Sequence, residues 1–406
     1  MNSKALEGIK ILEYAQLVSG PYCIKLLADL GADVVKIEPP GNGDEARRRG
    51  PFVNDAPHPE RSGLFLYLNT NKLGITLNPD SSAGKKVFCE LVKWADILVE
   101  DNPPQKMIDI GLDYHSLKEI NPRLIMTSIT PFGQTGPYRD YKGYNLNTEH
   151  GSGLAYLTPS APLDPEILNR EPIKSPGFVG DYICGLSAAG ATLAALYGLL
   201  TMGIGQQVDI SKQETLLHHQ RTNLSWYCAD GVVTDRSTLG GGGAWGGILP
   251  TKDGYALVLA PQWHQWQGFV DLMGRPKWTE DERFTVEEFP KYAPEVRPFV
   301  MSWAADHTTE EIYRGGQEHD CPFASVYSPA EVLASEHLKA RRFFVDIDHP
   351  EAGTITYPSA PCRFSKTPWH VERPAPLLGQ HNEEVYCHRL GYSHDDLVRM
   401  RQAGVI

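Results

Sequence analysis

The stretch IKILEYAQLVSGPYCIKLLADLGADVVKIE, residues 9–38, decides the fold class of this chain. Its first six residues have the pattern of a short apolar strand, and a helix follows from Ser19 to Gly31 with leucines at helical spacing. A second apolar strand occupies Asp33–Glu38. Strand, helix and strand in this order form a βαβ unit, which predicts a parallel sheet.

The same alternation repeats along the first half of the chain. The predicted elements are a strand at Gly74–Leu77, a helix at Ser82–Trp94, a strand at Ile97–Glu100, a helix at Tyr114–Ile120 and a strand at Leu124–Ser128. This pattern predicts an open α/β sheet. It changes after about residue 220, because seven glycines fall within 231–247 and residues 248–325 mix short strands with short helices. Helices are predicted again at Pro329–Ala334, His337–Phe344 and Ser393–Ala403.

The composition limits the partners of the chain. Its 406 residues, 41% hydrophobic and 22% charged, are typical of a soluble globular protein of two or three domains. A formal net charge of -12 argues against a nucleic-acid or anionic-membrane partner, since both need a positive surface. Seven widely spaced cysteines, none in a C-x-x-C pair, predict a reducing compartment, the cytoplasm, without a disulfide framework.

Two segments bear on export and on membranes. Met1–Lys10 has no long apolar run, so no signal peptide is expected. Ile183–Leu200 carries no charge over 18 residues, but as a helix it is only ~27 Å long. It also contains several glycines and small polar residues, which favours a close-packed buried helix over a membrane span.

The most informative motif is SPGFVGDYICG at 175–185, in which a lone acid, Asp181, lies between Gly180 and Gly185 before a small-residue helix. Aspartate is a preferred helix N-cap, and capping needs no further function. The alternative is a carboxylate nucleophile, which the helix N-terminus would keep ionised. The flanking glycines would then let a substrate carbonyl approach the backbone. Spacing alone leaves both readings open.

Three other motifs also have two interpretations. The segment Gly41–Ala46 fits the dinucleotide fingerprint G-x-G-x-x-G/A, but no apolar helix follows it, so a nicotinamide or flavin site is not expected. Arg47–Arg49 is either a solvated basic loop or a clamp for phosphates. Gly240–Gly243 is either a linker or a lid whose bare N–H groups face a ligand. No histidine pair has metal-ligand spacing, so no metal site is predicted.

Several segments together resemble one family. The opening LEGIKILEYAQLVSGPYCIKLLADLGADVVKIEPPGNGDEARRRGPF at 6–52 resembles the start of the class III CoA-transferases, which include formyl-CoA transferase, carnitine CoA transferase and α-methylacyl-CoA racemase. Further matches in family order are LNTNKLGITLN at 68–78, ADILVEDNPP at 95–104, GDYICGLSAAGATLAALYGL at 180–199, GIGQQVDISKQE at 203–214, SPAEVLASEHLKARRFF at 328–344 and LGQHNEEVYCHRLGYSHDDL at 378–397. The resemblance therefore covers nearly the whole chain.

The resemblance implies a fold and an assembly. A large Rossmann-like domain would be built from both chain ends, residues 1–220 and 326–406, with a smaller α+β domain at 221–325. Two ring-shaped subunits would interlock into a homodimer, although a heteromeric assembly also occurs among such enzymes. No metal or prosthetic group would be needed, because coenzyme A enters as acyl-CoA substrate.

The resemblance also implies a set of site residues. Asp181 falls at the family's nucleophilic aspartate, which passes through a mixed anhydride and an aspartyl-CoA thioester. The residues expected along CoA are Gln16, Leu17, Val18, Ser19, Arg47, Leu77, Asn102, Lys142, Tyr144 and Asn145. The loop expected to cover the aspartate is Gly240, Gly241, Gly242, Gly243 and Ala244. Covering the site would shield a reactive anhydride from water.

The chain also departs from the formyl-transferase pattern, and other functions remain open. Gln16 and Val18 replace a histidine and a glutamine, Pro39 replaces a common arginine, and EDN at 100–102 replaces ENF, which weakens an oxalate or formate assignment. A racemase would need a histidine near Tyr144 as a base. A silent partner subunit or a plain CoA-binding module would not need Asp181 beside a glycine loop.

The sequence says little about the acids that are exchanged. Trp245, Trp263 and Trp266 lie in or after the glycine-rich segment and form either the core of the small domain or an acyl pocket. An acyl pocket of this kind would select a bulky or aromatic acid. Succinyl-CoA is the donor that the family suggests.

Overall fold

The computed structural model of the chain describes residues 4–159, 171–236, 245–285 and 292–406. The chain divides into two compact units. The first contains residues 1–154, 174–221 and 342–406, and the second contains residues 155–173 and 222–341. Residues 155–173 and 326–341 thus belong to the second unit, whereas the sequence analysis assigned both to the large domain.

The first unit is built on a parallel sheet of six strands. The strands are β1 (Lys10–Tyr14), β2 (Asp33–Glu38), β3 (Lys72–Thr76), β4 (Ile97–Glu100), β5 (Ile125–Thr130) and β6 (Gln207–Ser211). Their order across the sheet is β3-β2-β1-β4-β5-β6, and every neighbouring pair is parallel. The predicted parallel sheet is confirmed, but β6 was not among the predicted strands.

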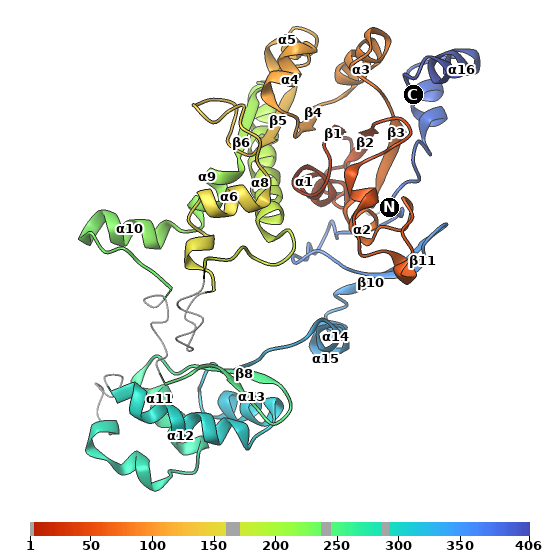
Figure 1. Cartoon of the computed structure of the whole chain (residues 1–406). Coiled ribbons are helices and arrows are strands. Elements are labelled where there is room, and N and C mark those ends of the chain that lie inside the picture. The colour runs from red at the N-terminus through yellow and green to blue at the C-terminus, as the bar shows by residue number, and fades with distance from the viewer. Residues whose placement is uncertain (1–3, 160–170, 237–244, 286–291) are drawn as a thin grey trace. The chain divides into compact units, whose positions relative to one another are not determined.

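Helices cover both faces of this sheet (Figure 1). Those of the first unit are α1 (Ser19–Ala28), α2 (Gly63–Leu68), α3 (Ser82–Trp94), α4 (Pro104–Asp109), α5 (Tyr114–Lys118), α6 (Asn145–Gly151), α8 (Val179–Met202), α9 (Lys212–His218) and α16 (His394–Gln402). Short 3-10 turns lie at Glu45–Arg48 and Val53–Asp55, and a π-helical turn lies at Glu384–Arg389. A hairpin of β10 (Phe344–His349) and β11 (Gly353–Pro358) completes the unit.

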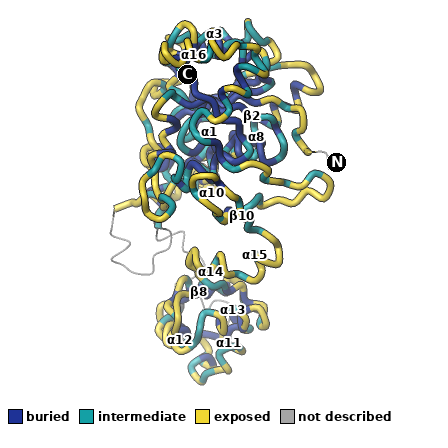
Figure 2. The backbone as a smooth tube through the Cα atoms, turned by 90° about the vertical axis from the view of Figure 1, so that its right-hand side faces the viewer, coloured by how far each residue is buried: buried dark blue, intermediate teal, exposed yellow. Residues whose placement is uncertain are grey.

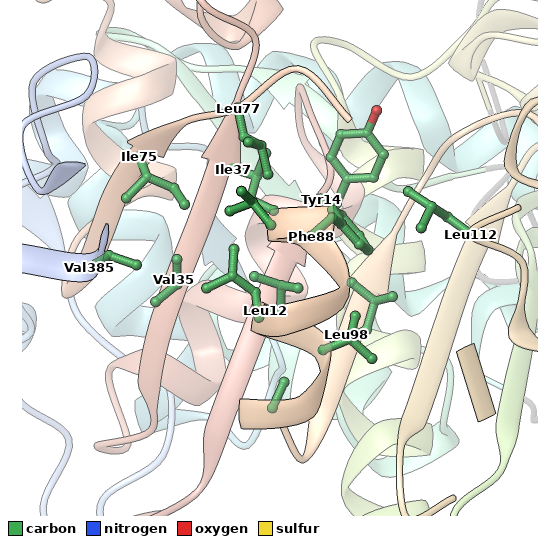
Figure 3. Packing of buried hydrophobic residues seen from close by; sticks show 14 of the residues in the cluster. Leu12, Tyr14, Val35, Ile37, Ile75, Leu77, Phe88, Leu98, Leu112 and Val385 are labelled. Carbon is green, nitrogen blue, oxygen red and sulfur yellow. The ribbon is translucent and has the colours of Figure 1, made fainter. Parts of the chain in front are cut away.

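Alternating residues of each strand enter the two cores on opposite faces of the sheet. Leu12, Val35 and Leu98 pack against α3 and the π-helical turn, as the labelled side chains in Figure 3 show. Their neighbours Ile11 and Val34 join the opposite core with α1 and α8. In Figure 2 the tube is mostly dark blue where α1 and β2 lie. Burial on both faces explains why these strands are continuous apolar runs.

The end of the chain protects the open edge of the sheet. The backbone N–H of Thr76 on β3 donates to Oδ1 of Asn382 at 2.9 Å, and the N–H of Gly74 donates to Nδ1 of His381 at 3.0 Å. The side chain of Tyr386 donates to the Thr76 carbonyl at 2.6 Å. An edge strand exposes unpaired backbone groups, so these contacts replace a further strand.

Helix α8 is long and apolar, but it is only partly buried. It is the one helix among the described residues with the length and composition to cross a membrane, and half of its most apolar window is buried. One side packs against α1 and β5. The other side exposes apolar side chains: Leu186, Tyr197, Leu200 and Met202 are each more than half exposed (57–71%). The predicted close packing therefore holds for one side of the helix only.

The second unit has a small antiparallel sheet and its own core. The strands β7 (Gly247–Pro250), β8 (Tyr255–Val258) and β9 (Ala324–Ser325) pair in that order. The unit also contains the helices α11 (Trp263–Leu272), α12 (Ala293–Ala305), α13 (Thr309–Glu318), α14 (Pro329–Ala334) and α15 (Glu336–Ala340), and a 3-10 turn at Ala155–Leu157. Helix α10 (Arg221–Asp230) begins at the boundary between the units.

Candidate functional site

The strand order reverses between β1 and β4, and loops from both strands meet there. In open parallel sheets, ligands bind at the carboxyl ends of the strands where the order reverses. The backbone N–H of Gln16, just after β1, donates to both carboxylate oxygens of Asp101, just after β4, at 3.1 and 3.0 Å. The side chain of Asn102 donates to the Tyr14 carbonyl at 3.1 Å. The two loops are therefore tied together at the expected position of a ligand site.

The loop after β1 is held in an uncommon conformation. Leu17 has a φ of 61°, in the left-handed region that a leucine rarely adopts. Its N–H donates to Oδ1 of Asp44 at 2.9 Å. Asp44 also lies 2.8 Å from Nζ of Lys36, which itself pairs with Glu13 at 2.9 Å. Because residues in sparsely populated conformations persist only where surrounding contacts enforce them, this buried ion network supports the loop.

Asp181 lies in the first turn of α8 and does not cap it. The helix begins at Val179, and its N-cap residue is Phe178. The carboxylate instead accepts hydrogen bonds from the hydroxyl of Ser19 at 3.0 Å and from Nζ of Lys212 at 2.8 Å. Both donors bind Oδ1. Because Phe178 is the N-cap residue, the N-cap interpretation of Asp181 is wrong. Oδ2 has no hydrogen bond from any residue that the structure describes, so this oxygen is available to a reactant.

Burial and charge set the electrostatics around Asp181. The residue is 7% exposed, and Lys212 is its ion-pair partner. Burial disfavours the ammonium charge of Lys212, but the carboxylates of Asp181 and Asp101 raise its pKa above the ordinary value. Burial raises the pKa of Asp101 to about 8, although Lys212 opposes that shift. Lys212 therefore stays protonated near neutral pH and lies close to two acidic residues.

The glycines beside Asp181 allow close contacts between α8 and neighbouring segments of the same chain. A Cβ at Gly180 would lie 2.3 Å from Oδ1 of Asn145, and a Cβ at Gly185 would lie 2.6 Å from the carbonyl oxygen of Ser19. The prediction that these glycines admit a substrate carbonyl is not what the packing indicates. They allow α8 to approach α6 and α1 closely enough for Asp181 to meet Ser19.

A second buried carboxylate lies beside the start of α8. Glu149 is fully buried and accepts from Nδ2 of Asn145 at 2.8 Å and from the N–H of Ser175 at 2.8 Å. Oδ1 of Asn145 is buried without a hydrogen-bond partner among the described residues. An unpaired buried acceptor is costly, and this oxygen packs against Gly180 at the start of α8.

The other residues expected along CoA fall into two groups. Val18, Ser19 and Leu77 are buried, and Gln16, Leu17 and Asn102 are partly exposed at the carboxyl ends of β1 and β4. Lys142 and Tyr144 are exposed, Tyr144 by 72%, in the segment that leads into α6. The structure thus brings the loop residues and Asn145 to the same edge of the sheet as Asp181.

The geometry does not favour Arg47 as a phosphate ligand. Its guanidinium is fully buried, donates to both oxygens of Glu38 at 2.6 and 2.7 Å, and pairs with Glu60. It also stacks 3.7 Å from the centre of the Phe65 ring. An arginine committed to two acids has no free donor fork for a phosphate. Arg48 and Arg49 are exposed, as expected for a solvated basic loop.

The remaining predicted residues lie elsewhere. Gly240–Ala244 falls outside the described residues. Trp245 and Trp266 are buried in the core of the second unit, with ring centres 5.1 Å apart, and Trp263 packs against that core. These tryptophans therefore belong to the core of the second unit, as one of the two interpretations predicted. Within 4–159, 171–236, 245–285 and 292–406, no group of three or more His, Cys, Asp or Glu side chains is placed to hold a metal ion.

The sequence reasoning did not identify Lys212 or Asp101. Both residues directly follow strands at the carboxyl edge of the sheet. Lys212 is also the first residue of α9, where the helix dipole disfavours a cation. A charge that breaks such a local rule is a signal of function, and it was available from the sequence once β6 was recognised.

Comparisons with known proteins agree with this arrangement. The family model "CoA-transferase family III" matches residues 6–382. The chain is 30% identical to succinyl-CoA--D-citramalate CoA-transferase of Chloroflexus aurantiacus, covering 99% of this chain and 98% of that one. It is 32% identical to formyl-CoA:oxalate CoA-transferase of Streptomyces coelicolor over the whole of both chains.

The fold has a close counterpart among solved structures. A CAIB/BAIF family protein from Brucella suis superposes with a TM-score of 0.83 at 27% identity, covering 95% of this chain and 99% of that one. The family model thus matches nearly the entire chain, and the relatives align with it from end to end. The chain belongs to CoA-transferase family III and is an enzyme of that kind.

Proposed function

We propose that the enzyme moves coenzyme A between two carboxylic acids and that Asp181 is its nucleophile. The observation that carries the proposal is the asymmetric environment of this carboxylate. Oδ1 is held by Ser19 and Lys212, while Oδ2 has no partner in the described part of the chain. A carboxylate fixed through one oxygen can attack through the other without losing its orientation.

The reaction needs only acyl transfers. Oδ2 attacks the carbonyl carbon of the donor thioester, the C–S bond breaks, and CoA leaves as a thiolate while a mixed anhydride forms. The thiolate then attacks the carbonyl carbon of Asp181, which releases the donor acid as a carboxylate and leaves an aspartyl-CoA thioester. The acceptor carboxylate repeats both steps in reverse and regenerates Asp181. No electron or proton is gained or lost over the cycle.

The position of CoA is part of the same proposal. CoA thioesters are the substrates of this family. A CoA site is supported by the residues at the edge of the sheet near the unpaired oxygen of Asp181. These are the loop Gln16–Ser19, Asn102 and Asn145.

Trapping the acylated aspartate tests the proposal. The purified enzyme is mixed with succinyl-CoA, the donor type named for a relative, and quenched with hydroxylamine or borohydride before intact-mass and peptide analysis. A modification that maps to Asp181 in the wild type and is absent from Asp181→Ala is the expected result. Exchange of the α-proton in deuterated water without any modification would instead indicate racemase chemistry.

We also propose a homodimer in the cytoplasm. The apolar side chains exposed along α8, among them Tyr197 and Leu200, support a further contact of this helix. All seven cysteines are free thiols, which supports a reducing compartment. Light scattering of the purified protein tests the assembly: a dimer is expected, whereas a monomer that pairs only with a second gene product would indicate a heteromeric enzyme.

A further inference from the structure

We propose that Lys212 is a positioning residue that compensates the negative charge of the site while this charge moves from Asp181 to the leaving groups. The inference rests on the proposed function of Asp181. It assigns to Lys212 a role in the reaction in addition to a contact within the fold.

The geometry around Lys212 supports this role. Its Nζ lies 2.8 Å from Oδ1 of Asp181, and the two side chains are 18% and 10% exposed. Ser19 is a neutral donor to the same oxygen at 3.0 Å. Lys212 is the one cation in the described chain within ion-pair distance of the nucleophile.

The proposed reaction keeps one negative charge in the site at every step. The charge begins on Asp181, passes to the CoA thiolate when the anhydride forms, and passes to the free carboxylate when the thioester forms. Asp181 is neutral in both acylated forms. A cation that could interact only with the Asp181 carboxylate would therefore not stabilise the negative charge in those forms. A flexible lysine can follow the charge over a short distance, and opposite charge is worth more in a partly buried site than in water.

Other ionisable groups surround the pair, and they do not replace Lys212. The groups that face it are Asp101 after β4, Glu149 on α6, and Tyr182 and Cys184 on α8. Burial raises the pKa of Tyr182 and of Cys184 to about 12, so both stay neutral near neutral pH. Neither Asp101 nor Glu149 can supply a positive charge to the carboxylate of Asp181. Lys212 is therefore the group whose removal would make ionisation of Asp181 harder.

The test is the pH dependence of Asp181 acylation in Lys212→Met. Single-turnover labelling by succinyl-CoA is followed by intact mass from about pH 5.5 to 8.5. Loss of the neighbouring cation disfavours negative charge at the attacking group, so the acid limb of the rate should move to higher pH by about one pH unit. The rate should therefore fall most at the acid end of the range, by up to about tenfold for a shift of one pH unit, and part of the loss should be recovered at high pH.

Lys212→Arg keeps the charge and should keep the acid limb at the wild-type position, even if the rate falls. Lys93→Met, which removes an exposed lysine of α3, is the matched control and should not change the profile. Thermal unfolding of each variant identifies losses that come from the fold, and Lys212→Gln replaces Lys212→Met if the latter does not fold.

The outcomes separate the two proposals. If wild-type enzyme is never labelled at Asp181, the proposed function fails. If the wild type is labelled but the acid limb of the folded neutral variant is unchanged, or the arginine variant shifts as far as the methionine variant, only the role of Lys212 is overturned.

Discussion

Gly185 of α8 lies directly against the backbone of Ser19 on α1, and a Cβ at this glycine would stand 2.6 Å from the carbonyl oxygen of Ser19. Carbon and oxygen atoms do not approach so closely without a shift of one backbone. The contact sets the distance between the two helices, and with it the distance from Ser19 to the carboxylate of Asp181.

Gly185→Ala should therefore destabilise the enzyme and slow acylation. Overpacking of this kind costs about 1–3 kcal/mol, measured as the free energy of unfolding in urea. A displaced Ser19 should also reduce the labelling rate of Asp181 by about tenfold. Gly190→Ala on the same helix is the control, because a Cβ there meets nothing within 4 Å; it should stabilise by up to about 1 kcal/mol. Equal effects of the two substitutions would contradict the helix contact.

Arg47→Met should reduce stability and leave the salt dependence of CoA binding unchanged. The substitution leaves Glu38 buried without its partner, which typically costs about 3–5 kcal/mol. Arg48→Met, at an exposed neighbour, should change the unfolding free energy by less than about 0.5 kcal/mol. Titration of CoA at two salt concentrations completes the test: a weaker salt dependence in a folded Arg47→Met protein would restore this residue as a phosphate ligand.

Stability should fall as the pH rises from about 4 to about 8, in part through Asp101. Burial raises the pKa of Asp101 to about 8, above its value in the unfolded chain of roughly 4. Between these values the folded state binds more protons than the unfolded state, so the contribution is present at low pH and is lost as the pH passes through the folded value. Burial also raises the pKa of Glu100 to about 7, with the same sign.

Melting temperatures of Asp101→Asn across this range check the prediction, because the amide cannot titrate and the slope should become shallower. Glu119→Gln, at an exposed acid of the same unit, should leave the slope as in the wild type. An unchanged slope in Asp101→Asn would show that this carboxyl is ionised normally.

Trp245→Ala should unfold the second unit rather than change the preference for acyl chains. The ring stacks on Phe269 with centres 5.6 Å apart and meets Trp266 edge-on at 5.1 Å. Loss of a buried tryptophan typically costs about 3–5 kcal/mol. Activity on small and large donors should fall together at the temperature where near-ultraviolet dichroism is lost. A folded variant that loses only large donors would place this residue in an acyl pocket.

The local sequence pattern predicted those helices and strands that are determined by their own residues. Asp33–Glu38, Ser82–Trp94 and Ile97–Glu100 have the predicted bounds, because continuous apolar runs and a spaced apolar stripe need no information from elsewhere. β6 was missed because Gln207–Ser211 is a short edge strand with alternating polar residues, and its pairing with β5 spans about 80 residues of chain. Residues 155–173 were assigned to the large domain because nothing in the local pattern marks the unit boundary at 154/155.

The site was predictable in part. Asp181 was found by its flanking glycines and by resemblance, but its partners come from α1 and α9, which only the fold brings together. Arg47 was misjudged because a charge run gives no sign of which arginine turns inward. Glu38 is on an apolar strand, and a buried acid at that position was the available hint of a buried base.

The division of the chain has a consequence for its synthesis. The backbone crosses between the two units at 154/155, 173/174, 221/222 and 341/342. Thr76 and Asn382, which bond across the edge of the sheet, are separated by 306 residues. A ribosome must therefore produce the whole second unit before the edge of β3 is covered. Until then the nascent sheet has an uncovered edge strand, so chaperone dependence during translation should concentrate in the interval between these two residues.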